Sequence, residues 1–304
     1  MPFTSKKTVV IIAGPTAVGK TRVAIQLAKH FKTEIISADS RQCFKELNIG
    51  VAKPSKEELQ EVKHYFIAYH SIQEEVTAVT FEQYALQKAN KLFQQHDIVI
   101  MVGGTGLYIK AFCEGMDLIP NINPAIRQQV IKLYEQNGKT WLQAQLQEKD
   151  PLFSQTGEMQ NPQRMMRALE VVESSGQSIL SFRKGEKVKR DFNIIKIGLE
   201  VPKEDLHRNI HNRVNAMMEA GLPEEVKQLI LFRKLKALQT VGYAELFNYF
   251  DGKLSIEKTV EQIKTATRQY AKRQLTWFKK DQEIKWFSPS QLKEMIECVE
   301  SPHS

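Results

Sequence analysis

The stretch GPTAVGKT at residues 14–21 limits the possible folds of this chain more than any other feature. It matches the pattern G-x-x-x-x-G-K-[ST], the apolar run at residues 8–13 predicts a strand before it, and residues 22–29 predict a helix after it. In such a strand, loop and helix, backbone N–H groups turn inward as an anion nest, and the helix N-terminus adds its positive dipole end. We therefore predict a phosphate-binding loop formed by Gly14, Pro15, Thr16, Ala17, Val18, Gly19, Lys20 and Thr21.

Two side chains of this loop have separate predicted roles. Lys20 supplies a point charge for a terminal phosphate, and the hydroxyl of Thr21 is a ligand for Mg²⁺. The alternative is a chance glycine turn, which the flanking strand and helix disfavour. The motif does not identify the molecule that carries the phosphate, nor what happens to it.

The composition is that of a globular protein with a cationic surplus. The chain has 304 residues, 42% hydrophobic and 26% charged, enough for one large domain or two smaller ones. Its net charge of +8 favours a polyanionic partner, although modestly basic proteins without nucleic acid are also common. Cys43, Cys113 and Cys298 form no metal or redox spacing and suggest a reducing cytoplasm. We expect no signal sequence and no membrane segment, because the apolar runs are too short.

A carboxylate follows the second predicted strand, residues 34–38. Asp39 would lie beyond the carboxyl end of that strand, where ligands bind in doubly wound sheets, and close to the phosphate loop if the two strands are neighbours. Two functional roles are open, holding Mg²⁺ or accepting a proton as a general base. A helix N-cap or turn residue is the structural alternative, because Asp suits both positions.

A second glycine turn, GGTG at residues 103–106, follows the apolar strand predicted at residues 98–102. P-loop enzymes that hydrolyse nucleotides usually have an acidic residue at such a strand end, but here the acid Asp97 lies at the opposite end. The sequence therefore argues against ATP or GTP hydrolysis and favours a reaction in which the bound phosphates leave. Thr105 either lines the site or caps the helix predicted at residues 107–112.

The order of the predicted elements favours an α/β fold with a P-loop core, a parallel sheet and an inserted all-helical domain. The core takes residues 1–115 and 191–304, with basic C-terminal helices, and the insertion takes residues 116–190. A strand at residues 192–201 is interpreted as the last of the sheet, and a short strand is predicted at 65–69. Further core helices are predicted at residues 56–63, 81–95, 203–220, 224–236, 243–250 and 256–280.

Three helical patterns fill the insertion, at residues 125–136, 140–149 and 162–174. Arg164 and Arg167 are three residues apart and so share one face of the last helix.

The helix predicted at residues 256–280 carries a basic stripe, in which Lys264, Arg268 and Lys272 repeat every four residues. Such a stripe suits a phosphodiester backbone. A solvated basic face is the alternative interpretation.

Five separated parts of the sequence together resemble one family, the tRNA dimethylallyltransferases, also called tRNA isopentenyltransferases. They are GPTAVGKT, SADSRQ, GGTGLYIKA, NPQRMMRALEV, and the pair ALQTVGYAEL and RQYAKRQLTWF. They follow the family's order through the whole chain, and the ordered set is far more specific than the phosphate loop alone. The resemblance implies transfer of a dimethylallyl group from dimethylallyl diphosphate to the exocyclic amine of an adenosine in tRNA, with release of diphosphate. That adenosine follows the anticodon on its 3′ side (position 37), in tRNAs that read codons beginning with U.

The resemblance also implies roles for single residues. The phosphate loop would hold the prenyl diphosphate, while Lys20, Thr21 and Mg²⁺ stabilise the leaving charge. Asp39 matches the general base that accepts a proton from the adenine amine, and Thr105 matches a residue that contacts the substrate near the diphosphate. The implied contacts to the tRNA anticodon stem-loop are Asp39, Ser40, Arg41, Gln42, Arg127, Gln163, Arg164, Met165, Met166 and Arg167, to which the basic stripe adds Arg268 and Lys272.

The approach to the PQR helix departs from the family, whose pattern there is close to His-Pro-Asn-Asp. This chain has Glu158, Met159, Gln160 and Asn161 instead. Asn161 keeps the capping role, and the family pattern implies nothing for the other three.

Three other functions share parts of this pattern. A small-molecule or nucleotide kinase would use the same loop for ATP and would yield a phosphorylated product. A prenyl transferase for free adenine nucleotides would have less need of the insertion and of the basic stripe. A nucleotide-gated RNA-binding module would bind RNA without turnover. We expect the tRNA-modifying enzyme, with ATP as a further ligand of the loop, acting as a monomer in the cytoplasm.

Overall fold

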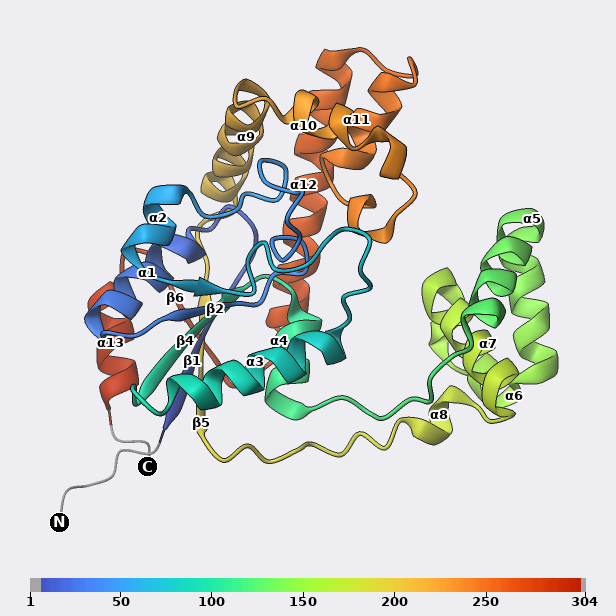
Figure 1. The fold of residues 1–304 in the computed structure, drawn as a ribbon, viewed down its shortest axis with the longest axis horizontal. Helices are drawn as coiled ribbons and strands as arrows, with labels where there is room; N and C mark the ends of the chain where they lie inside the picture. The colour runs from blue at the N-terminus through green and yellow to red at the C-terminus, as the bar shows by residue number, and fades with distance from the viewer. Residues whose placement is uncertain (1–6, 302–304) are drawn as a thin grey trace. The chain divides into compact units, whose positions relative to one another are not determined.

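The computed structural model describes residues 7–301, in which six strands form one parallel sheet (Figure 1). Its strands are β1 Thr8–Ala13, β2 Ile35–Ser37, β3 His64–Tyr65, β4 Ile98–Gly103, β5 Asn193–Leu199 and β6 Ile284–Phe287, in the spatial order β3-β2-β4-β1-β5-β6. This confirms the predicted α/β fold class.

β1 lies at the centre of the sheet, and all six of its residues are buried, as is typical of a parallel strand covered on both faces. It pairs with β4 on one side and β5 on the other, so Ala13 lies opposite both Gly103 and Gly198. The phosphate loop therefore leaves the sheet between two other strand ends. The first two strands are not neighbours, because β4, which comes later in the chain, lies between them.

Helices cover both faces of the sheet. The connection from β1 to β2 through α1 (Lys20–His30) runs along the sheet in one direction, and that from β3 to β4 through α3 (Ala78–Leu92) runs in the other. Right-handed crossovers therefore place these two helices on opposite faces, as Figure 1 shows. α13 (Leu292–Glu300) packs beside α1. The shorter α2 (Lys56–Glu61) and α4 (Gly106–Glu114) follow β2 and β4 in the chain.

The helices between β5 and β6 pack on one another. α12 (Ile256–Phe278) contacts both α9 (Lys203–Glu219) and α11 (Tyr243–Phe250), and α10 (Leu222–Gln228) lies against α9 and α11. The helix predicted at 224–236 ends early. Two 3₁₀ turns, Ile230–Phe232 and Lys236–Leu238, follow it instead of further helix. The run LILF at residues 229–232 lacks helical periodicity and leaves Leu231 exposed.

Two further expectations about strands are corrected. The strand at 192–201 is not the last, because β6 adds to the sheet at its edge and pairs only with β5. With four residues and one neighbour, β6 lacks the long apolar run of a central strand. The strand predicted at 65–69 is reduced to β3, since Phe66 and Ala68 adopt positive φ angles that end the ladder.

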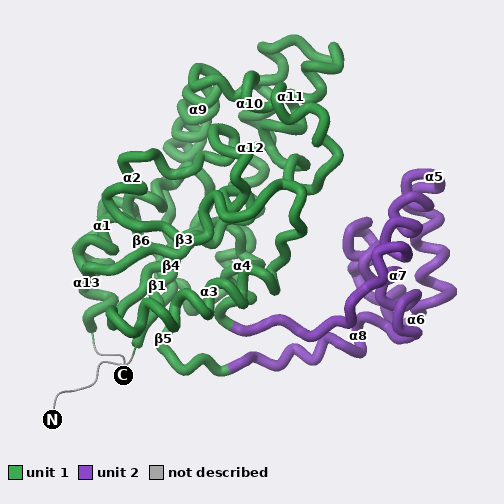
Figure 2. Tube along the Cα trace, in the orientation of Figure 1, with its two compact units in different colours: residues 1–113, 189–304 green, residues 114–188 purple. Residues whose placement is uncertain are grey.

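Contacts along the chain define two compact units (Figure 2). The sheet unit comprises residues up to 113 and from 189, and the helical unit comprises residues 114–188, two residues from each predicted boundary. The helical unit contains α5 Pro124–Lys149, α6 Pro151–Ser154, a 3₁₀ turn Gly157–Gln160, α7 Pro162–Ser175 and α8 Ile179–Phe182. α5 joins the two helices predicted at 125–136 and 140–149, and it is broken between them at Gly138, where φ is +73°.

The helical unit has its own apolar core, in which Leu142 and Leu146 of α5 and Phe153 of α6 are fully buried. Met165 and Met166 of α7 belong to this core. The resemblance implied that both contact tRNA, but their side chains are packed inside the unit, whereas Gln163 and Arg164 beside them are exposed. Within residues 7–301, no helix is both long and apolar enough to cross a membrane.

Candidate active site

The loop between β1 and α1 has the backbone of an anion nest. Gly14, Ala17 and Gly19 adopt positive φ angles of 147°, 64° and 98°. A Cβ at residue 14 would lie 2.8 Å from the carbonyl oxygen of Leu199, so glycine is required there. No side chain caps the N-terminus of α1, which leaves its first N–H groups directed at the loop. This is the geometry predicted for residues 14–21.

Lys20 folds back over this loop, and its Nζ donates to the carbonyl oxygen of Pro15 at 2.6 Å. The pKa of Lys20 is lowered to about 7: burial is the main cause and the nearby Arg213 cation adds to it, while the Asp39 carboxylate acts in the opposite direction. The lysine is therefore close to half-charged at neutral pH, and an anion placed beside it would restore its full charge.

Asp39 follows β2 and closes a tight turn. Its Oδ1 accepts hydrogen bonds from the backbone N–H groups of Arg41 at 2.8 Å and Gln42 at 3.1 Å. The turn role considered from the sequence is thus present, and Asp39 also lines the same cavity as Lys20. β1 and β2 are not adjacent, but both point their carboxyl ends at this edge of the sheet.

Thr105 lies behind that turn, outside the set of residues that line the cavity. Its Oγ1 accepts the backbone N–H of Ser40 at 3.0 Å and donates to the hydroxyl of Ser40 at 3.3 Å. Gly103 explains the close approach, since a Cβ there would lie 2.1 Å from the carbonyl oxygen of Ala38. The side chain of Thr105 therefore holds the Asp39 turn in place, and its predicted contact with the substrate stays a prediction.

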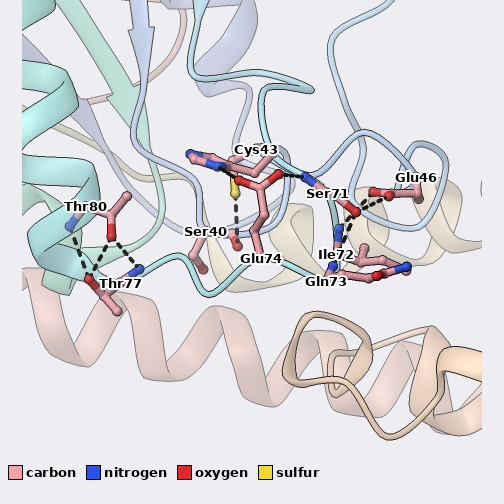
Figure 3. Close-up of polar contacts among 10 residues, drawn as sticks. Ser40, Cys43, Glu46, Ser71, Ile72, Gln73, Glu74, Thr77 and Thr80 are labelled. Atoms are coloured by element: carbon pink, nitrogen blue, oxygen red, sulfur yellow. Dashed lines mark hydrogen bonds and ion pairs between the residues drawn. The ribbon is translucent and has the colours of Figure 1, made fainter. Parts of the chain in front are cut away.

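The segment after the turn is fixed by polar contacts of its own (Figure 3). The thiol of Cys43 points at the carbonyl oxygen of Ser40, 3.6 Å away. Glu46 accepts from the hydroxyl of Ser71 and from the N–H of Ile72, which ties the chain after Cys43 to the loop before α3.

A cavity of about 840 Å³ joins the phosphate loop to the Asp39 turn. A volume of this size is typical of a site for small ligands. Its other walls are residues 50–54, α9, residues 239–245 and one face of α12. The arrangement can accommodate a phosphorylated donor and part of a second substrate together.

Gln42 builds one of these walls. Its Nε2 donates to the carbonyl oxygens of Val51 at 3.2 Å and Ala52 at 2.9 Å. Glu225 holds the other end of the same loop by accepting the backbone N–H groups of Ile49 and Gly50. The predicted tRNA contact of Gln42 stays a prediction; the side chain shapes the cavity.

Arg213 of α9 is a site residue that the sequence did not suggest. Its Nη1 donates to the hydroxyl of Thr16 at 3.2 Å, and burial lowers its pKa. With Lys20 it places a second cation beside the phosphate loop. No local signal reveals this residue, because α9 carries several polar and charged residues and only the fold selects the one that faces the cavity.

α12 presents two different faces. Tyr270, Arg273 and Gln274 line the cavity, whereas Arg268 and Lys272 of the predicted stripe do not. Arg268 donates to Nε2 of His211 on α9 and to Thr265, and Lys264 is paired with Glu261. Lys272 is exposed. The predicted stripe is therefore partly committed to contacts within the protein.

Two carboxylates hold the arginines of the helical unit. Glu158 pairs with Arg164 at 2.8 Å and with Arg183 at 3.0 Å. The buried Glu170 pairs with Arg167 at 3.4 Å and with Arg127 at 3.9 Å. The departure from the family pattern at Glu158 thus supplies an anchor for two guanidinium groups.

The residues present suit Mg²⁺ only in combination with a phosphorylated ligand. Thr21 and Asp39 bring a hydroxyl and a carboxylate to the cavity. No group of three or more His, Cys, Asp or Glu side chains in the described part of the chain could hold a metal by itself. Mg²⁺ commonly takes one or two carboxylates and completes its shell with substrate phosphates and water, so this donor set fits it.

Fold and site together define a P-loop transferase, with a phosphate cradle, a carboxylate in the same cavity and no acidic residue at the end of β4. Comparison with known proteins gives the family. A family model described as IPP transferase matches residues 42–281, more than half of the chain. A tRNA dimethylallyltransferase of Cytophaga hutchinsonii is 45% identical over 97% of this chain and 97% of its own, and one of Flavobacterium johnsoniae is 47% identical over 93% and 94%.

Solved structures agree. A tRNA isopentenylpyrophosphate transferase from Bacillus halodurans has a TM-score of 0.72 and 31% identity, and covers 97% of this chain and 96% of its own. A eukaryotic dimethylallyltransferase described as acting on tRNA has a TM-score of 0.77 and 25% identity, over 95% of this chain and 75% of its own. The chain belongs to the tRNA dimethylallyltransferase family.

Proposed function

We propose that this member of the family transfers a dimethylallyl group from dimethylallyl diphosphate to the exocyclic amine of the adenosine 3′ to the anticodon of tRNA. The observation that carries the proposal is one cavity in which the phosphate loop faces the Asp39 carboxylate. The new bond joins the amine nitrogen to C1 of the prenyl group. The bond from C1 to the diphosphate oxygen breaks, and the amine loses one proton.

The donor side of the cavity stabilises the leaving diphosphate. The loop N–H groups and the cations Lys20 and Arg213 all face developing negative charge. Bound Mg²⁺, held by Thr21 and the phosphates, would add a Lewis acid for the same oxygens. Because the pKa of Lys20 is about 7 in the free cavity, the arrival of a diphosphate draws a proton onto the amine.

Asp39 serves the acceptor side. Its Oδ1 is held by the two backbone N–H groups of its own turn, which fixes the carboxylate toward the cavity. The other oxygen takes the proton that the adenine amine loses. Thr105 supports this position through Ser40.

The glycines at the end of β4 leave the cavity without the acid that activates water in hydrolytic P-loop proteins. The absence of this acid counts against nucleotide hydrolysis, in which water attacks a phosphate. The kinase alternative has no observation in its favour, and it does not account for the helical unit.

Cationic residues outside the cavity are the proposed contacts to tRNA. They are Arg127, Arg164 and Arg167 of the helical unit, with Arg268 and Lys272 of α12. A target base must leave its stack to reach a cavity of this kind. We further propose that the protein acts as a monomer in the cytoplasm; its three cysteines are free thiols, in keeping with a reducing compartment.

Incubation of the protein with labelled dimethylallyl diphosphate and unmodified tRNA tests the proposal. Label should enter the tRNA with release of one diphosphate per prenyl group. ATP with small-molecule acceptors is the control, and a phosphorylated product there, without prenyl transfer, would establish a kinase. Transfer to free adenine nucleotides as fast as to tRNA would remove tRNA as the acceptor.

A further inference from the structure

Gln274 of α12 connects the phosphate loop to the end of β4. The residue is 6% exposed. Its Oε1 accepts the backbone N–H of Thr16 at 2.8 Å, and its Nε2 donates to the carbonyl oxygen of Gly104 at 2.9 Å. Only this orientation of the amide satisfies both partners, because an N–H can only donate and a carbonyl can only accept.

The absence of a side chain at Gly104 makes room for this contact. A Cβ at residue 104 would lie 2.2 Å from Nε2 of Gln274. Glycine at the end of β4 therefore has a positive role in addition to the absence of an acid: it admits the amide of Gln274 to the space beside the phosphate loop.

The hydrogen bond from Thr16 fixes one peptide plane of the loop. In a trans peptide the N–H and the C=O point in opposite directions. The N–H of Thr16 points to Gln274, and the carbonyl of Pro15 in the same peptide points to Nζ of Lys20. Gln274 thus sets the peptide on which Lys20 rests.

Two side chains of α9 support the same part of the loop. Arg213 donates to the hydroxyl of Thr16, and Asn209 donates to the carbonyl oxygen of Ala17 at 3.3 Å. Because Ala17 has a positive φ angle, this segment needs outside support to keep its shape.

We propose that Gln274 is a positioning residue that fixes the Pro15–Thr16 peptide and so connects α12, which also presents Tyr270 and Arg273 to the cavity, to the phosphate loop. The inference rests on the proposed function for the identity of the donor. The bridge itself predicts only that a diphosphate binds to a loop whose shape depends on Gln274.

The main variant is Gln274→Met, which keeps the size of the side chain and removes both hydrogen bonds. Affinity for inorganic diphosphate, measured by calorimetry, should fall about tenfold, because the N–H of Thr16 loses its buried partner. The KM for dimethylallyl diphosphate should rise and kcat should fall, while the KM for tRNA changes less than about threefold. Gln269→Met is the matched control, an exposed glutamine on the same helix, and should change none of these values.

A double-mutant cycle gives a second test. Gly104→Ala pushes the amide of Gln274 aside, and Gln274→Ala removes it; each alone should weaken diphosphate binding by about tenfold. The double variant should be no weaker than either, because the added methyl group then fills vacated space. If Gln274→Met does not fold, Gly104→Ala still tests the bridge, because the added methyl group displaces only the end of the Gln274 side chain.

The results separate a failure of the bridge from a failure of the proposed function. If wild type transfers the prenyl group but the Gln274 and Gly104 variants bind diphosphate and turn over within twofold of it, the bridge does not position the loop. Losses that multiply in the double variant would likewise overturn it. If the variants lose diphosphate affinity as expected but wild type transfers no prenyl group to tRNA, the bridge stands and the proposed function fails.

Discussion

At the scale of single residues, Lys20 is a cation kept partly neutral by its surroundings until a ligand arrives. With a pKa of about 7, it is charged at pH 6 and mostly neutral at pH 8.5. Binding of diphosphate above pH 7 must therefore take up a proton, and affinity should fall by up to about tenfold per pH unit there. Calorimetric titration of inorganic diphosphate from pH 6 to 9 measures this. Dividing the affinity of wild type by that of Lys20→Met removes the effect of the ligand's own titration. A quotient that does not change with pH would contradict the lowered pKa of Lys20.

The same lysine has a consequence for stability. Its pKa is lower in the folded than in the unfolded state, so the unfolded chain binds more protons between about pH 7 and 10.5. Burial of the charged amine therefore lowers the free energy of unfolding by its full amount below pH 7, and by less as the pH rises. Lys20→Met should therefore raise the melting temperature at pH 6 to 7, with a gain that shrinks toward pH 10. A gain that grows with pH would have the wrong sign.

Asp39 should act mainly in the chemical step. Asp39→Asn keeps an oxygen that can accept the N–H groups of Arg41 and Gln42, so the turn should persist. Turnover should fall by about 10²- to 10⁴-fold, the range for loss of a general base. Affinity for tRNA should stay within about threefold, measured by filter binding without donor. A loss of affinity equal to the loss of turnover would make Asp39 a binding residue.

At the scale of secondary-structure elements, α12 separates cavity contacts from solvent contacts. Lys272→Gln should weaken tRNA binding and reduce the slope of log K against log salt by about one, if the exposed amine meets a phosphate. Lys293→Gln on α13 is the matched control, because it removes the same charge from an exposed site. Equal slopes for both variants would return Lys272 to a solvated face. Arg268 is a poorer probe, since its removal also breaks the contact with His211.

Glu158 is an acidic residue whose removal is expected to weaken tRNA binding, because it pairs with two arginines of the helical unit. Glu158→Gln raises the net charge by one, which by itself favours RNA. It also releases Arg164 and Arg183 from a shared anchor. If the anchor positions these guanidinium groups for phosphates, tRNA affinity should fall about threefold despite the added charge, measured at fixed salt. Tighter binding would show that Glu158 only neutralises its neighbours.

Long buried strands were predicted well from the sequence, and the short strands at the edges of the sheet were not. β1 and β4 are nearly continuous apolar runs, which is how a strand covered on both faces appears. β6 has four residues at an edge, and its pattern is too short to distinguish it from a turn. The phosphate loop and Asp39 were predicted because each follows a strand. Arg213 and Gln274 were not, because their roles depend on packing between helices far from the loop in sequence.

At the scale of the whole molecule, the first and last residues of the helical unit lie side by side. The backbone N–H of Val188 donates to the carbonyl oxygen of Glu114 at 2.9 Å, and Lys187 pairs with Glu114 at 2.7 Å. Replacing residues 116–186 with a short Gly-Ser linker should leave the sheet unit folded, with affinity for inorganic diphosphate within about twofold of wild type. Affinity for tRNA should fall at least about tenfold. Retained tRNA affinity would mean that the sheet unit alone carries recognition.

The hydrogen bond between Thr16 and Gln274 spans 258 residues of sequence. A loop that is among the first segments to be synthesised therefore lacks one of its supports until nearly the whole chain has been made. The centre of the sheet has the same property, since β1 pairs with β5, which follows the helical unit. Domains usually form from the N-terminus during synthesis, but here the first strand and its loop must wait for late partners. The helical unit has an apolar core of its own, so it can fold on the ribosome before the phosphate site is complete.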